Sequence, residues 1–394
     1  MIHQFKRRLA CLVCALALLA ASLPTAFAAP SAPAEPAAQT LSASDVKAMQ
    51  QADDAVAALT GSADFEQMSP AQRSTAALEQ LDQLIRQGLV EKDSVYADDE
   101  NGMISFAYTC GALGGILVSD EDPEETMLSA LPDETLDAQL QLMAENKRVG
   151  TAVIYYAFDN TVNSSRYPYY SYMRSYWDSL GLQTRLDTDV TLSDLRKMGS
   201  YDLCILSTHG AYYTYQYGWL IKKTATRPLI LLTERSSFWN DLRYGFDLLS
   251  HRVVKVNGMY AATSDFFRSA YRGSGIVLSE TCEFYGKNGH VDTSIADGLL
   301  AAGAKAVAGY VNNVYAVYSR SMLWTMVNRM IGGDTLADAA VYAKNAYGTD
   351  DILWYSGQGG KRPHAAASYL VLSGDRLVTL PDPHLEEESA SLAA

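Results

Sequence analysis

The sequence predicts an α/β fold with a mostly parallel sheet. From residue 150 onward, short apolar runs alternate with helical patterns, which is the order of a parallel sheet with crossover helices. Two of the runs, 201–206 and 275–279, are largely apolar throughout, as in strands that are covered on both faces. A smaller region with helical and hairpin patterns precedes this alternation. We therefore expect a small helical and β-hairpin region followed by a larger α/β domain.

The first residues have the organisation of an export signal. Three basic residues precede an apolar stretch from Leu9 to about Leu19, and Ala26-Phe27-Ala28 offers a small-residue cleavage site. We expect a signal peptide over residues 1–28, cleavage after Ala28, and a secreted, extracellular protein. No later run reaches the ~20 apolar residues that a membrane-spanning helix needs. Residues 29–43 are rich in Ala, Pro and Ser and predict a disordered leader.

Charge and cysteine content limit the partners. Without the signal, 28 Lys and Arg face 45 Asp and Glu, a net charge near −17, which argues against nucleic acid and anionic lipid as partners. The remaining cysteines are Cys110, Cys204 and Cys282, so at least one thiol is free or pairs between chains. Cys204 lies inside an apolar run and is expected in the core, whereas Cys282 ends its run in a polar setting.

The elements before residue 147 are helical first and then strand-like. Ser44 is a candidate helix cap, and the pattern stays helical to about residue 87. Asp98-Asp99-Glu100-Asn101-Gly102 predicts a hairpin turn that leads into a strand at 103–108. We define residues 44–146 as an N-terminal helical and hairpin region, and residues 147–380 as the main domain.

The elements of the main domain follow from apolar period, caps and glycines. Gly181 stops an aromatic-rich helix, Ser193 can cap a short one, and Gly332-Gly333 ends a long one. Residues 211–267 are less regular, with strand candidates at 229–233 and 253–259, and residues 381–394 predict a disordered tail. The remaining strands are expected at 151–156, 183–186, 201–206, 275–279, 305–310 and 368–372, and the helices at 167–180, 193–198, 295–302, 319–331 and 335–346.

Two segments carry the candidate chemistry. Ser207-Thr208-His209-Gly210 and, 73 residues after His209, Glu280-Thr281-Cys282-Glu283 each close an apolar run. Chemistry in open α/β sheets gathers at the carboxyl ends of such strands. A His and a Cys there predict a cysteine nucleophile with its proton partner. The other histidines show no metal-ligand spacing, and no phosphate-binding glycine motif or Gly-x-Ser-x-Gly elbow is present. We expect neither a metal nor a cofactor.

These residues resemble the caspase-like clan of cysteine peptidases, which includes caspases, gingipains, clostripain, legumain and the CHAT domains. The resemblance covers roughly residues 150–380. The family's His-Gly after the third core strand corresponds to His209-Gly210, and its Cys after the fourth corresponds to Cys282. Residues 297–307 look like the helix-then-strand segment of CHAT and gingipain-like domains, and residues 369–375 are similar to their closing strand and Gly-Asp.

The chain departs from the family in two respects. Thr281 stands where the family often has a small residue before the nucleophile, as in Ala-Cys. The 73-residue spacing between His209 and Cys282 is longer than in caspases. An insertion must therefore pack between the two strands.

The resemblance implies a fold and a reaction. The fold is a caspase-like three-layer sandwich, and the activity is that of a secreted thiol protease, a hydrolase that cleaves peptide bonds in peptide or protein substrates. Cys282 would attack the peptide carbonyl and His209 would give a proton to the leaving amine. The oxyanion would be held by the backbone N–H groups of Gly210 and Cys282. The sequence does not indicate an oligomeric state.

Two acidic residues are candidates for the substrate pocket. Glu280 stands two residues before Cys282, and residues i and i+2 of a strand point the same way. Its carboxylate favours a basic P1 side chain, as in clostripain-like members with Asp-Ala-Cys. Legumain-like members also have an acidic residue there and prefer Asn, so the P1 residue stays open. Asp159, after the first core strand, is the second candidate.

Two alternatives remain at this point. The chain could be a non-catalytic module that binds a peptide or glycan through its Tyr-rich segments near 167–177 and 212–219. It could also be a transpeptidase, because an amine resolves an acyl-thioester as readily as water does. The N-terminal region is a candidate prodomain, since Lys147-Arg148 at its boundary would suit self-processing by an enzyme with a basic P1 preference.

Overall fold

The computed structural model describes residues 40–119, 150–157, 169–217, 222–352 and 367–382, all within the compact unit Thr40–Ala394. The expected signal peptide, the Lys147-Arg148 pair and Asp159 lie outside these ranges. No helix among the described residues is both long and apolar enough to cross a membrane.

A six-stranded sheet forms the centre of the main domain. The strand order is β15-β14-β11-β6-β4-β5. The neighbours from β5 to β14 run parallel, and β15 pairs antiparallel with β14. The strands are β4 (Gly150–Tyr156), β5 (Leu182–Asp187), β6 (Leu203–Ser207), β11 (Ile276–Ser279), β14 (Ala306–Val311) and β15 (Tyr369–Gly374). These are the six strands predicted from the apolar runs, with ends shifted by at most two residues.

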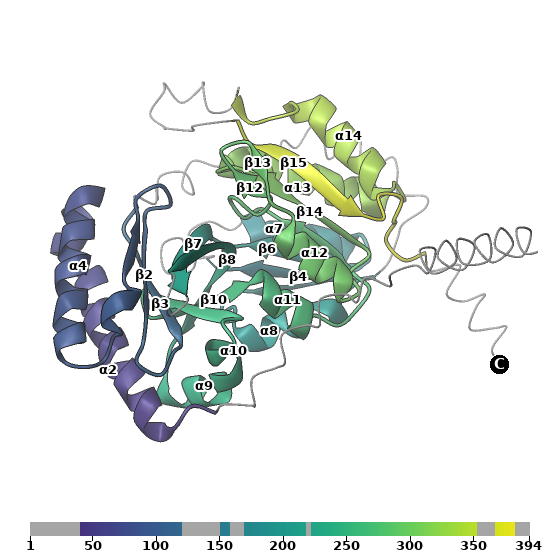
Figure 1. Ribbon diagram of the computed structural model, residues 1–394. Helices are drawn as coiled ribbons and strands as arrows, with labels where there is room; N and C mark the ends of the chain where they lie inside the picture. The colour runs from purple at the N-terminus through teal and green to yellow at the C-terminus, as the bar shows by residue number, and fades with distance from the viewer. Residues whose placement is uncertain (1–39, 120–149, 158–168, 218–221, 353–366, 383–394) are drawn as a thin grey trace, which may run out of the picture. The chain divides into compact units, whose positions relative to one another are not determined.

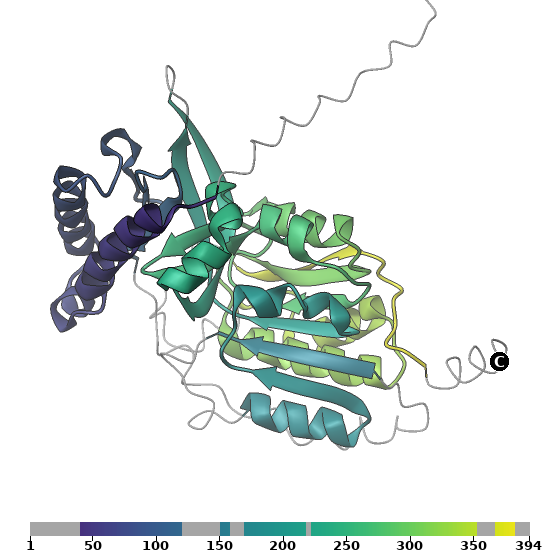
Figure 2. The ribbon, with the colours of Figure 1, turned by 90° about the horizontal axis from the view of Figure 1, so that it is seen from below.

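Helices cover both faces of this sheet. Successive residues of a strand point to opposite faces, so each apolar strand places side chains in a core on either side. In β4, Ile154 faces one apolar core and Val153 faces the other. Figure 2 shows the strands between two layers of helices. One layer holds α7 (Tyr169–Ser179), α13 (Ala316–Ile331) and α14 (Leu336–Tyr347), and the other holds α8 (Leu192–Leu195), α11 (Ser264–Ala270) and α12 (Ser294–Ala301). The predicted α/β fold with a mostly parallel sheet is confirmed.

A second, seven-stranded sheet joins the N-terminal region to the insertion of the main domain. Its order is β1-β2-β3-β9-β10-β8-β7, antiparallel except for the parallel pair β3–β9. Blue β2 and β3 lie beside teal and green β7, β8 and β10 in Figure 1. The strands are β1 (Tyr96–Asp98), β2 (Met103–Ala107), β3 (Leu113–Leu117), β7 (Gly210–Tyr217), β8 (Lys223–Arg235), β9 (Val253–Val256) and β10 (Met259–Thr263). One sheet therefore contains strands from both sides of the domain boundary expected near residue 147.

The insertion is more regular than the sequence suggested. The described part of residues 210–263 contains four strands and two short helices, α9 (Phe238–Arg243) and α10 (Gly245–Leu249). The strand expected at 253–259 is instead two strands, β9 and β10, because Asn257 and Gly258 both have positive φ, at 50° and 76°. Asn-Gly is the usual residue pair of a two-residue hairpin turn. The sequence contained this turn signal, and the apolar pattern on either side of it obscured the break.

Within the described residues, three α-helices precede the second sheet: α2 (Ala43–Thr60), α3 (Ala63–Gln67) and α4 (Pro70–Arg86). The cap of α2 is Ser42, not Ser44, and it forms a capping box with Asp45. Leu41 is buried. The disordered leader predicted for residues 29–43 is therefore too long at its C-terminal end, because Leu41 and Ser42 already belong to the packed structure.

A buried charge cluster fastens α2 to the insertion. The ammonium of Lys255 on β9 forms ion pairs with Asp53 on α2 and with Asp241 on α9, and its side chain is 0% exposed. The hydroxyl of Tyr108 donates to Asp53, and that of Tyr260 donates to Asp241 at 2.8 Å. Each charged group in this apolar surrounding thus has partners from distant parts of the chain, which is the condition for burying charge.

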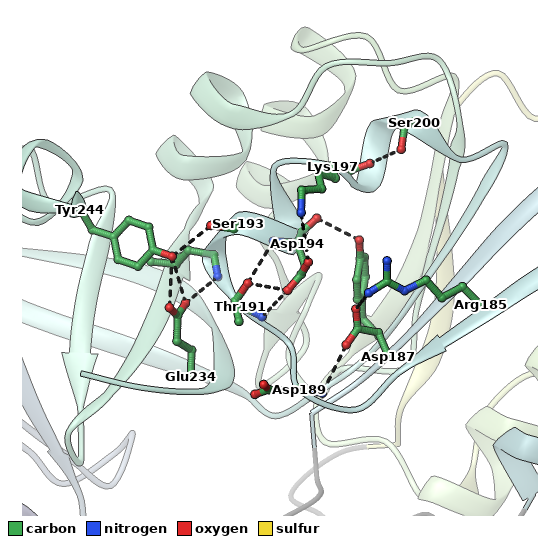
Figure 3. A network of polar contacts seen from close by, with 12 residues as sticks. Arg185, Asp187, Asp189, Thr191, Ser193, Asp194, Lys197, Ser200, Glu234 and Tyr244 are labelled. Atoms are coloured by element: carbon green, nitrogen blue, oxygen red, sulfur yellow. Dashed lines mark hydrogen bonds and ion pairs between the residues drawn. The ribbon is translucent and has the colours of Figure 1, made fainter. Parts of the chain in front are cut away.

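A polar network fixes the loop after β5 against the second sheet (Figure 3). Glu234 at the end of β8 accepts a hydrogen bond from the Leu192 N–H at 2.8 Å and from the Tyr244 hydroxyl at 3.1 Å. Thr191, rather than the predicted Ser193, caps α8 through a capping box with Asp194. The carboxylates of Glu234 and Asp194 are occupied by structural hydrogen bonds, and the bond from Leu192 to Glu234 links the loop after β5 to the second sheet.

Candidate active site

His209 lies in the two-residue link through which the chain passes from one sheet to the other. β6 of the first sheet ends at Ser207, and β7 of the second begins at Gly210. The His209 carbonyl accepts a hydrogen bond from the Leu231 N–H at 3.0 Å, which fixes the link to β8. His209 itself is half-buried. The fold therefore holds this residue at the carboxyl end of β6 with part of its surface accessible.

Cys282 begins a tight turn shortly after β11. The next residue, Glu283, has a φ of 57°, a left-handed conformation that costs a non-glycine residue energy and is concentrated at functional sites. Asn312, which follows β14, holds this turn: its carbonyl accepts from the Glu283 N–H, and its N–H donates to the Gly286 carbonyl, both at 2.8 Å. Cys282 is half-buried, and its Sγ lies 3.9 Å from the Val314 carbonyl oxygen.

The two segments meet at one edge of the six-stranded sheet. β6 and β11 are parallel neighbours, with Leu206 opposite Ser279, so their carboxyl ends lie together. The hydroxyls of Thr208 and Thr281 are 3.3 Å apart. A Cβ on Gly210 would lie only 2.0 Å from the Cys282 carbonyl oxygen.

Because real Cβ atoms do not approach a backbone oxygen so closely, glycine is needed at position 210. The fold thus brings His209-Gly210 against Thr281-Cys282, as the sequence predicted.

The register of β7 and β8 leaves the Gly210 N–H turned away from β8. Gly210 stands opposite Ile230, and the preceding carbonyl, that of His209, accepts from the Leu231 N–H. In an antiparallel ladder this makes residues 210 and 230 a non-hydrogen-bonded pair. Since β7 is the last strand of its sheet, the Gly210 N–H points out from the sheet edge, where a donor for substrate is expected.

The three thiols of the described residues have different surroundings, and none of them is in a disulfide. Cys204 is buried inside β6, and this burial raises the pKa of its thiol far above the ordinary value. Burial also raises the pKa of Cys110, whose Sγ lies 3.3 Å from the Met49 Sδ. Cys282 is the thiol at the carboxyl end of the sheet, in contact with the His209-Gly210 segment. The prediction that Cys204 is a core residue is confirmed.

Glu280 is a buried carboxylate on the helical side of the site. It is 8% exposed, and the Tyr170 hydroxyl donates to its Oε2 at 2.6 Å. Burial raises the pKa of Glu280, while the charge of Arg320 and hydrogen bonds from Tyr170, Ser207 and Ser319 oppose this rise. The carboxylate therefore already has internal donors. Its contact with a P1 side chain stays a prediction, and such a side chain would have to join or displace these donors.

The Tyr-rich segments contribute mainly to cores. On α7, Tyr170 and Trp177 pack against the sheet, and Tyr172 is the more exposed member at 39%. After Gly210, Tyr213 and Tyr215 point into the core of the second sheet, whereas Tyr217 is 47% exposed. An extended aromatic face at these two segments is thus largely absent from the surface of the described residues. Within those residues, no group of three or more His, Cys, Asp and Glu side chains is arranged to hold a metal ion.

Sequence reasoning missed two residues that shape the site. Asn312 holds the turn after Cys282, and Lys287 contacts Glu283, with its Nζ 3.4 Å from the Glu283 Oε1. Asn312 has a φ of 65°, and Asn after a predicted strand is a weak signal for such a conformation. Nothing in the sequence indicated Lys287, because its other partners, Glu100 and Asn101, come from a distant segment.

The sequence was compared with known proteins: no protein-family model matches the chain, and no curated protein matches it.

Proposed function

We propose that this chain is an exported cysteine peptidase of the caspase-like clan, acting on peptide or protein substrates. The proposal rests on one observation, the packing of His209-Gly210 against Thr281-Cys282 at the adjoining ends of β6 and β11. In chain order, β6 and β11 are the third and fourth strands of the six-stranded sheet. The resemblance assigns the His and the Cys to the ends of these two strands. Helices on both faces of that sheet agree with a three-layer sandwich.

The reaction follows from these groups. The Cys282 thiolate attacks the peptide carbonyl carbon and forms a tetrahedral intermediate, whose oxyanion takes a hydrogen bond from the Gly210 N–H. Collapse of the intermediate breaks the C–N bond, and the His209 imidazolium gives its proton to the leaving amine. Neutral His209 then takes a proton from water as the water attacks the thioester. This second attack releases the carboxylate product and regenerates the thiolate.

Glu280 is the candidate in the described residues for selecting the P1 side chain. It comes from the same strand end as Cys282, and both residues face the layer formed by α7 and α13. A buried carboxylate favours a cationic group, because charge-assisted hydrogen bonds are strengthened away from water. The nearby charge of Arg320 opposes this preference. Weighing the Glu280 carboxylate against the Arg320 charge, we propose that the substrate has a basic P1 residue, with Asn as the competing choice.

The test is covalent labelling of the mature protein. Arginyl and asparaginyl peptidyl acyloxymethyl ketones are each incubated with the wild type, with Cys282→Ala and with the matched control Cys110→Ala, and intact masses are recorded. We expect an adduct on the wild type and on Cys110→Ala and none on Cys282→Ala. Faster labelling by the arginyl probe would support the basic P1 preference, and faster labelling by the asparaginyl probe would replace it with Asn.

A second readout separates the peptidase from a binding module. Limited alkylation by iodoacetamide at neutral pH, with peptide mapping, compares the three thiols within one chain. A nucleophilic Cys282 is modified first, because reactivity follows the thiolate fraction and exposure, while burial suppresses Cys204. If folded protein gives no adduct with either ketone and Cys282 reacts no faster than Cys110, the peptidase proposal is abandoned.

A further inference from the structure

The turn that begins at Cys282 is held from two sides. We call residues 282–289 the nucleophile turn. On one side Asn312 forms backbone hydrogen bonds to Glu283 and Gly286, and its Oδ1 accepts from the Gly289 N–H at 3.2 Å. Asn312 is 6% exposed, and its Nδ2 donates to the Ala367 carbonyl at 2.9 Å. This side belongs to the main domain itself.

The other side is formed by the N-terminal region. Lys287 donates through its Nζ to the Glu100 carbonyl at 3.1 Å and to the Asn101 Oδ1 at 3.0 Å. The adjacent Asn288 donates through Nδ2 to the Glu100 Oε1 at 3.0 Å. The acceptors lie in the turn between β1 and β2, residues 98–102, which we call the support turn. Three hydrogen bonds therefore join the support turn to the nucleophile turn across almost 190 residues of sequence.

The support turn is itself fixed, and it also reaches the His209 side of the site. The Asn101 N–H donates to the Asp98 Oδ1 at 3.1 Å, and the Asn101 Nδ2 donates to the Asp98 Oδ2 at 2.5 Å. Asp98 in turn accepts a hydrogen bond from Thr214, which lies on β7, the strand that starts beside His209. One short turn of the N-terminal region thus contacts both the segment that follows His209 and the segment that contains Cys282.

Lys287 has a second task, which is to neutralise a buried carboxylate beside the nucleophile. The Glu283 side chain is 9% exposed, and its Oε1 lies 3.4 Å from the Lys287 Nζ. Burial raises the pKa of Glu283, and Lys287 opposes this effect. Without Lys287, the carboxylate next to Cys282 would lose its cation and would either take up a proton or turn toward solvent. Either change alters the turn that carries the thiol.

We infer that Lys287 is a positioning residue through which the support turn of the N-terminal region holds the nucleophile turn in its reactive arrangement. The inference rests on the proposed role of Cys282 as nucleophile. It assigns the support turn, and with it the flanking strands β1 and β2, to the working enzyme, and it speaks against a prodomain that must leave before the enzyme acts. Displacing a reacting atom by about 1 Å can cost on the order of 10²-fold in rate.

The test compares Lys287→Met with a matched lysine variant. Lys222 donates to the Asp93 carbonyl at 3.0 Å, so Lys222→Met removes a lysine contact between the same two regions without touching the nucleophile turn. The measured quantity is the rate constant for iodoacetamide alkylation of Cys282 in folded protein. We expect Lys287→Met to lower this rate constant about tenfold and Lys222→Met to leave it unchanged. Lys287→Arg should keep the rate constant within about twofold of the wild type, because Arg can donate to both acceptors.

Asn101→Ala tests the same contact from the N-terminal side and should also lower the alkylation rate. Hydrogen exchange of the peptide covering residues 280–289 provides a readout that does not depend on the reactivity of Cys282. Faster exchange is expected in Lys287→Met and in Asn101→Ala and not in Lys222→Met. Unchanged alkylation and exchange in Lys287→Met would overturn the inference. An unreactive wild-type Cys282 with faster exchange in Lys287→Met would instead overturn the proposed function and leave the structural link standing.

Discussion

Replacing Lys255 by Met should strongly destabilise the protein. The Lys255 side chain is 0% exposed, and those of its two partners, Asp53 and Asp241, are 5% and 0% exposed. Met has nearly the volume of the lysine stem, so the apolar packing is largely kept and the charge is lost. Two buried carboxylates then lie close together without a cation.

The size of the effect follows from this burial. Breaking a buried ion pair by removing one partner costs about 3–5 kcal/mol, because the remaining charge is left uncompensated. Hydroxyl donors from Tyr108 and Tyr260 remain on the two carboxylates and keep the loss within this range. The cluster joins α2 to the insertion, so we expect the N-terminal region to loosen first. The measurement is urea unfolding of Lys255→Met and wild type at pH 8, followed by tryptophan fluorescence.

The pH dependence provides the control. Burial raises the pKa of Asp53, an effect that Lys255 opposes, so removing Lys255 raises this pKa further. A carboxyl group whose pKa is raised in the folded state favours folding when it is protonated, and this contribution is lost as the pH rises. The destabilisation should therefore be smaller at pH 5 than at pH 8. The triple variant Asp53→Asn, Lys255→Met, Asp241→Asn, which leaves no charge, should recover most of the loss. A loss below about 1 kcal/mol at pH 8, or one that does not change with pH, would refute the reasoning.

Two further predictions concern the candidate site. In Gly210→Ala, the new Cβ would lie 2.0 Å from the Cys282 carbonyl oxygen, so we expect alkylation of Cys282 to slow at least tenfold; Gly245→Ala, with its nearest atom at 3.4 Å, should react like the wild type, and equal rates in both variants would contradict the close packing. Burial raises the pKa of Glu280, so the protonated carboxyl is favoured in the folded state. Its contribution to folding stability is present at acid pH and is lost as the pH rises through the raised pKa. The melting temperature of Glu280→Gln should therefore fall less than that of the wild type between pH 5 and pH 8, and parallel pH profiles would show that Glu280 does not titrate in this range.

Local patterns in the sequence were sufficient for most elements of the main domain. Apolar runs identified the strands of the central sheet, and the His and Cys at two of their ends were found from the polar residues that follow those runs. The reason is that strand and helix periodicities are written in neighbouring residues. The caps were less certain: Ser42 and Thr191 took the positions predicted for Ser44 and Ser193, since several nearby hydroxyl residues can each cap a helix.

The second sheet could not be foreseen in the same way. The sequence did not predict β7 as a strand, because its place in the sheet depends on pairing with β8 and on contact with β1, which lies far away in the sequence. The pairing of Gly114 on β3 with Lys255 on β9 joins residues about 140 positions apart. Neither strand contains a signal for the other, because parallel pairing is specified by the packing of whole elements.

The sequence by itself determined the α/β class, the strands that end near His209 and Cys282, and the core position of Cys204, because these depend on local period and composition. The tertiary structure decided that β6 and β11 are neighbours, which brings the His209 and Cys282 segments into contact. It also decided that Lys287 meets the support turn and that Lys255 meets Asp53. Such contacts form only when distant elements pack together, and the free energy of burying apolar surface and pairing buried charge selects them.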